Sequence, residues 1–252
     1  MIRKIFSPDR LKSRDSSRKR DFEIQRIETF SDGVFAFAVT LLIVSLEVPK
    51  SFEDLLISMR GFFAFGISFA ILFSIWSEQH RFFRSYGMED GFTIFLNGAL
   101  LFIVLFYTYP LKFLFTLLFS NQIYGTHDSP LKINTQQMPE LMMIYALGFI
   151  MIYILFFLMY FNVYRKSNER GFTSFEKFDC RSEMYKEAIM IFTGVLSLVF
   201  VFFIKGEQSI NSGMIYLLIP LGNIIFFTYR KKLRRKLFPQ SDVEDTHPDT
   251  AD

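Results

Sequence analysis

Six long apolar segments limit what this chain can fold into. They run over Thr29–Glu47, Leu55–Gln79, Phe92–Phe119, Leu141–Tyr164, Ala188–Ile204 and Met214–Tyr229. A helix needs about 20 mostly apolar residues to cross a bilayer, and each segment is near or above that length. A soluble protein of 252 residues would carry charge on every surface helix, whereas here the charged residues gather between the apolar segments and at the chain ends. The sequence therefore predicts an all-α integral membrane protein with six transmembrane helices.

The basic residues predict how these helices are oriented. Of the 28 Lys and Arg residues, 23 fall before the first segment, in the second and fourth connections, and after the sixth segment. The other side of the membrane receives only 5, which are Lys50, Arg60, Lys112, Lys132 and Lys205. Lys and Arg are enriched in cytoplasmic loops. We therefore expect both the N-terminus and the C-terminus in the cytoplasm.

The chain is expected to form one membrane domain with two polar ends. Residues 1–22 are a basic N-terminal arm, 23–230 the six-helix transmembrane domain, and 231–252 a basic and then acidic cytoplasmic tail. Pro110 is expected to kink the third helix, with Lys112 snorkelling toward an interface. Pro220 is expected inside the sixth helix, where neighbouring groups must satisfy the freed carbonyl.

Several function classes are disfavoured by composition. Cys180 is the only cysteine, so neither an internal disulfide nor a cysteine-based metal site is expected. The net charge of +3 is too small to indicate a nucleic-acid partner. We find no cluster of nucleophile, base and metal ligands of the kind an enzyme requires. No catalytic residue, metal or cofactor is therefore predicted.

The first apolar segment differs from an ordinary membrane anchor because it begins with polar residues. Asp32 lies about a turn inside the segment, where an ionisable group costs a few kcal/mol unless it is partnered. Trp76 and His80 close the second segment and Asn97 lies early in the third, at a similar expected depth. Their donor groups can bond Ser31 and Asp32. Two interpretations remain open: a structural network that holds helices together, or a proton-sensing or ion-coordinating site.

A second pattern runs along the same segment. Phe37, Leu41 and Val44 fall at helical spacing and predict one apolar stripe, with Gly33 at its start and Thr40 beside it. Such a stripe is typical of ordinary helix packing. Apolar constrictions also gate some channels by dewetting. The pattern by itself does not choose between these two roles.

The polar start of the first segment resembles a known family signature. The spacing Arg26, Phe30, Ser31, Asp32 is similar to that of the transmembrane protein 175 family, the endolysosomal potassium channels and their prokaryotic relatives. Trp76, His80 and Asn97 extend the resemblance, which covers roughly residues 22–230 and one six-helix repeat. It implies a potassium-permeable cation channel, a homotetramer in which the first helix of each subunit lines a central pore.

The resemblance also implies roles for individual residues. An apolar residue five positions after the signature aspartate forms the narrowest ring in this family, and Phe37 holds that place. Leu41 and Val44 would be the next pore-facing positions, and Thr40 would form the layer associated with cation preference. The family usually has a branched aliphatic residue where this chain has Phe37. This chain also lacks a Thr-Val-Gly-Tyr-Gly carbonyl filter, so weak to moderate preference for potassium over sodium is expected.

Two other functions remain as alternatives to the channel. One is a proton-coupled secondary transporter using Asp32 and His80, although neither an internal repeat nor paired discontinuous helices are evident. The other is a membrane assembly protein that conducts nothing. The expected partners are potassium ions, the lipid bilayer and further copies of the same chain. A multi-pass protein of a prokaryotic plasma membrane is favoured over an endosomal or lysosomal one.

Overall fold

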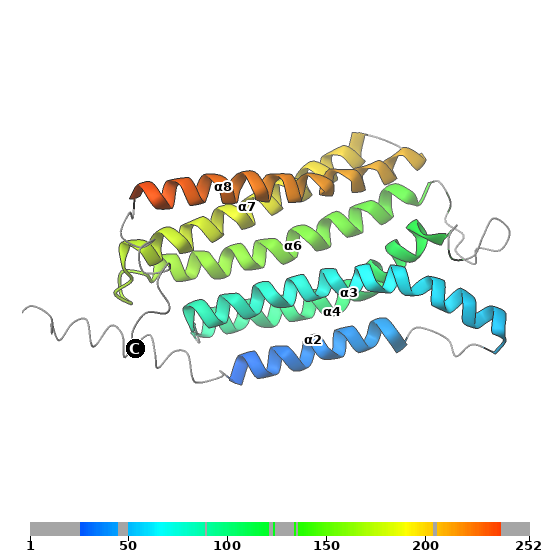
Figure 1. The fold of residues 1–252 in the computed structure, drawn as a ribbon, viewed down its shortest axis with the longest axis horizontal. Helices are drawn as coiled ribbons and strands as arrows, with labels where there is room; N and C mark the ends of the chain where they lie inside the picture. Colours follow the sequence, from blue (N-terminus) through cyan, green and yellow to red (C-terminus); the bar gives the residue numbers. More distant parts are fainter. Residues whose placement is uncertain are drawn as a thin grey trace, which may run out of the picture. The chain divides into compact units, whose positions relative to one another are not determined.

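The structure is a computed structural model, and every regular element in its described part is helical. It describes residues 26–44, 50–88, 90–120, 123, 134, 136–203 and 206–237. The elements are α2 (Arg26–Val44), α3 (Phe52–Tyr86), α4 (Gly91–Leu118), α6 (Met138–Arg165), α7 (Ser174–Phe203), the 3₁₀ helix η1 (Gly206–Leu217) and α8 (Leu218–Leu237) (Figure 1). The all-α prediction is confirmed for these residues.

The chain divides into two compact units, Met1–Pro130 and Leu131–Asp252. In the first unit α2, α3 and α4 pack against one another (Figure 1). In the second, α6 and α7 share the most extensive interface, η1 packs on both, and α8 contacts α7 and η1. The α6–α7 contact is close at Gly194, where a Cβ atom would lie 2.7 Å from Cγ1 of Ile150. A small residue at this position lets the two helices approach.

Five of the helical segments in the described part are long and apolar enough to cross a membrane: α3, α4, α6, α7 and the stretch Asn211–Leu237, which contains α8. The first expected span, which α2 carries, is not among them. Its 19 residues include the charged side chains Arg26, Glu28 and Asp32 in the first two turns. The six-span prediction is thus confirmed for five helices.

Local sequence signals set the helix ends. Ser51 and Asp54 form a capping box at the start of α3, and Gly87 ends that helix with a left-handed φ of 53°. Asp90 caps α4 by accepting from the backbone N–H of Thr93. With these ends, α3 extends past the apolar segment Leu55–Gln79 on both sides. The difference arises because hydropathy predicts only the part of a helix that can lie in hydrocarbon.

Two sequence predictions about prolines and lysine are refined by the structure. Pro110 lies inside α4, as expected. Pro220 lies in the first turn of α8, directly after the 3₁₀ helix η1, where its fixed φ suits the start of an α-helix. The ammonium of Lys112 donates to the carbonyl of Leu42 at 2.7 Å, so it binds protein backbone and does not simply snorkel.

Some predicted segments lie outside the described residues. These are the basic arm 1–22, most of the connection 121–140 between the third and fourth apolar segments, and the acidic end Pro239–Asp252. The basic start of the predicted tail is described, and it forms the last turns of α8, which ends at Leu237.

Candidate functional site on the first helix

The helix α2 presents two distinct faces. Ser31, Phe35, Ala38 and Leu42 recur at helical spacing and are all buried, which places that face against α3 and α4. Gly33, Phe37 and Thr40 lie on another face and are exposed. The Phe37 side chain is 57% exposed although it is large and apolar. An exposed apolar side chain that the described part of the subunit leaves uncovered indicates a contact with lipid or with another protein.

A buried chain of amide and hydroxyl groups joins the three helices of the first unit. Nδ2 of Asn97 donates to Oγ of Ser31 at 2.9 Å, and Nε2 of Gln79 donates to Oδ1 of Asn97 at 3.1 Å. Oγ of Ser31 donates to the carbonyl of Ile27 at 2.7 Å. The side chains of Ser31, Gln79 and Asn97 are almost completely buried. Each therefore makes the hydrogen bonds that burial in a low-dielectric core requires.

Gln79 is the residue of this hydrogen-bonded series that the sequence analysis did not predict. It lies beside His80 at the end of the second apolar segment, and it turns inward where His80 does not. Its signal was present: an amide inside an apolar helix normally marks an interhelical bond. The pattern could not tell which of the two neighbours faces the core.

A second branch reaches Asp32. Nε1 of Trp76 donates to Oδ1 of Asp32 at 2.7 Å, and the His80 ring stacks on Trp76 with centroids 5.3 Å apart. Among the described residues, His80 therefore contacts the Asp32–Trp76 pair by stacking its ring on Trp76. Asp32 itself is exposed, as are Arg26 and Phe30 earlier on α2. The structure brings Ser31, Asp32, Trp76 and Asn97 together, and adds His80 through Trp76.

The C-terminal part of α2 has its own polar features. The hydroxyl of Thr40 donates to the carbonyl of Ala36 at 2.9 Å, one turn back. That bond uses its proton, so the oxygen lone pairs remain for a ligand. Leu42 is in the last turn of α2, where helix carbonyls have no intrahelical donor, and Lys112 supplies one. The lysine charge also suits the negative end of the helix dipole. Leu41 is half-buried, and α2 ends at Val44.

Replacing Asn97 with alanine is expected to destabilise the first unit by about 2 kcal/mol. The change leaves the Ser31 hydroxyl and the Gln79 amide buried without the partner that each now has. Thermal unfolding of purified protein would measure the loss. Thr108→Val is the matched control, because Thr108 is also buried on α4 but donates to the carbonyl of Val104 on its own helix. Equal losses in both variants would contradict a special role for the interhelical chain.

Comparison with known proteins gives consistent matches. The family described as endosomal/lysosomal potassium channel TMEM175 matches residues 26–107, which include all the network residues. A potassium channel of Marivirga tractuosa is 38% identical over 223 residues, covering 84% of this chain and 90% of that protein. A potassium channel of Chamaesiphon minutus is 38% identical over 96 residues, covering 35% of this chain and 47% of that protein.

Solved structures agree with these sequence matches. A crystal structure of a variant of the potassium channel MtTMEM175, in complex with a Nanobody-MBP fusion protein, gives a TM-score of 0.72. It is 36% identical and covers 84% of this chain and 96% of that one. A lysosomal potassium-selective channel TMEM175 homolog from Chamaesiphon minutus gives a TM-score of 0.53 at 23% identity, covering 81% of this chain and 96% of that one. That second likeness shows the fold alone.

Proposed function

Because the chain belongs to the family of the endosomal/lysosomal potassium channel TMEM175, as the predicted resemblance implied, we propose that it is a potassium channel lined by α2. It is a multi-pass membrane protein, and its bacterial relatives indicate the plasma membrane. The detailed proposal is a homotetramer with both termini in the cytoplasm. In it α2 is the first of six spans and faces a central axis.

One observation carries the assignment of α2 to the pore. Its buried face packs on α3 and α4, while Phe37 and Thr40 project from a face that the subunit leaves open. A helix with charged residues in its first two turns is poorly suited to contact lipid along its whole length. Placed around an axis with three copies of itself, the same helix covers its stripe and turns its polar start toward the cytoplasmic mouth.

The proposed pore has an apolar constriction and one polar layer. Four Phe37 rings would form the narrowest part, followed by Leu41 and Val44 along the axis. An apolar ring excludes water and so opposes ion passage until it widens. Thr40 would supply a ring of hydroxyl oxygens whose protons are already donated to Ala36 carbonyls, which leaves lone pairs for a partly dehydrated cation.

The hydrogen-bonded network has a supporting role in this proposal. Ser31 and Asp32 bond Asn97 and Trp76, so the start of α2 is held against α4 and α3. Lys112 holds the other end through the carbonyl of Leu42. A pore helix fixed near both ends keeps its constriction aligned with the axis. Arg26, Phe30 and His80 flank the cytoplasmic end of this arrangement.

The proposal is tested by flux from liposomes that contain purified protein. We expect potassium efflux to exceed sodium efflux by a weak to moderate ratio, because a single hydroxyl layer replaces less of the hydration shell than a carbonyl filter does. Efflux should carry net charge and need no proton gradient. A strict requirement for a cotransported proton would favour the transporter alternative, and an absence of flux from tetrameric protein would favour the assembly-protein alternative.

A further inference from the structure

The outer face of α8 changes abruptly from apolar to cationic. Leu221, Ile225 and Tyr229 are all exposed, with Ile225 at 70%. Within the next two turns four exposed cations follow, and they are Lys231, Lys232, Arg235 and Lys236. Only 6% of the most apolar part of the stretch Asn211–Leu237 is buried inside the subunit. The described helix therefore carries a long uncovered apolar band that ends at a dense positive patch.

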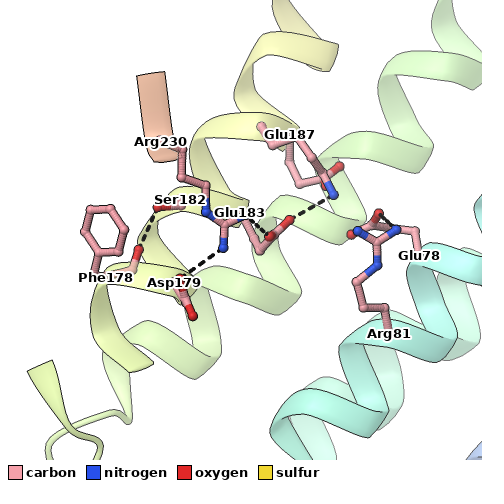
Figure 2. Close-up of polar contacts among 9 residues, drawn as sticks. Glu78, Arg81, Phe178, Asp179, Ser182, Glu183, Glu187 and Arg230 are labelled. Carbon is pink, nitrogen blue, oxygen red and sulfur yellow. Dashed lines mark hydrogen bonds and ion pairs between the residues drawn. The ribbon is translucent and has the colours of Figure 1, made fainter. Parts of the chain in front are cut away.

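The two remaining cations of the same basic run point the other way. Figure 2 shows Arg230 reaching from α8 to Asp179 and Glu183 on α7, where its guanidinium donates at 3.0 Å and 2.7 Å. The guanidinium of Arg234 lies over the Phe175 ring at 4.9 Å from its centroid. These contacts orient α8 about its axis. They bind two cations to α7, whereas the other four side chains are exposed.

We propose that Lys231, Lys232, Arg235 and Lys236 form a binding surface for the headgroups of anionic phospholipids. The apolar band that ends at Tyr229 sets the depth, because exposed aliphatic side chains belong in hydrocarbon and a tyrosine suits the interface. The four cations then fall at headgroup level. Cationic side chains directly beyond a membrane helix attract anionic lipid, and lysine and arginine both bond phosphate oxygens.

An anionic phospholipid fits this cationic surface of α8 better than a second copy of the chain would. A contact between copies would have to bring four cations opposite an acidic surface or another basic one. The carboxylates of Asp179 and Glu183, which face this part of α8, are already engaged with Arg230. A lipid headgroup needs no such complementary surface and is present at the required depth. This inference uses only the membrane orientation from the proposed function and does not depend on ion conduction.

Native mass spectrometry of the purified intact protein tests the proposal. Phosphatidylglycerol would be titrated against phosphatidylcholine, and the bound lipids would be counted for each subunit number. We expect wild type to retain phosphatidylglycerol preferentially. A variant with all four outward cations changed to glutamine should bind it at least about tenfold more weakly, since each cation near an anionic surface adds a favourable increment. The preference should also weaken at high salt.

The matched control removes the same charge elsewhere. Changing Arg3, Lys4, Arg10 and Lys12 to glutamine takes four cations from the N-terminal arm and leaves α8 intact. This variant should keep the preference. Equal weakening in both variants, or weakening in the arm variant alone, would overturn the assignment to α8. A changed subunit number in the α8 variant would also overturn it, because the face would then lie between copies.

Discussion

Replacing Phe37 with alanine is expected to raise potassium flux through reconstituted channels by about tenfold or more, which corresponds to a barrier lowered by about 1.4 kcal/mol. The Phe37 ring is 57% exposed on the open face of α2, so its removal costs the subunit little packing. In the proposed tetramer the change deletes four rings from one constriction. A wider opening admits water, and a hydrated opening passes cations more readily. Liposome efflux of potassium measures the effect.

A graded series separates the constriction from a general loss of integrity. Phe37→Leu places the branched aliphatic side chain usual in the family at this position, and its flux should fall between those of wild type and Phe37→Ala. Phe192→Ala is the matched control, because Phe192 is 67% exposed on α7, outside the proposed pore helix. The control should leave flux unchanged. Wild-type flux in a folded, tetrameric Phe37→Ala protein would rule out Phe37 as the narrowest ring.

Much of the fold could be predicted because the bilayer imposes a simple pattern. The lengths of the apolar segments predicted, in the correct order, the five helical segments that are long and apolar enough to span a membrane. It could not locate their ends, because α3 and α7 continue past the apolar part into charged turns. It also could not foresee η1, because 3₁₀ helices longer than a few residues are uncommon and hydropathy does not distinguish them from α-helices.

The candidate site was less accessible to sequence reasoning. The polar residues on α2, α3 and α4 were recognisable because each interrupts an apolar segment. Their pairing was not, since a helix face must be known to within one residue to separate Gln79 from His80. The bond from Lys112 to Leu42 joins residues far apart in the chain, and nothing in the local pattern of either residue indicates the other.

Replacing Lys186 with methionine is expected to destabilise the second unit by about 3 to 5 kcal/mol. Its ammonium lies 2.9 Å from Oε2 of Glu183 and 3.1 Å from Oε1 of Glu187. The Glu187 side chain is fully buried, and Lys186 and Glu183 are nearly so. Methionine fills a similar volume but leaves two carboxylates without this cation. An unpaired buried charge is far more costly than the net gain from pairing it. Unfolding in a denaturing detergent, followed by circular dichroism, measures the loss.

Two further variants show whether burial of charge is the cause. Arg181→Met removes one cation from an exposed position on the same helix, where it contacts Tyr185, and should cost much less stability because solvent screens an exposed charge. Adding Glu187→Gln to Lys186→Met removes the charge of one of these two buried carboxylates, while Glu183 keeps its bond from Arg230, and should recover part of the stability. A lone Lys186→Met as stable as Arg181→Met would contradict the argument. The carboxylates would then be stabilised by other groups, and Lys186 would be a packing residue whose charge contributes little.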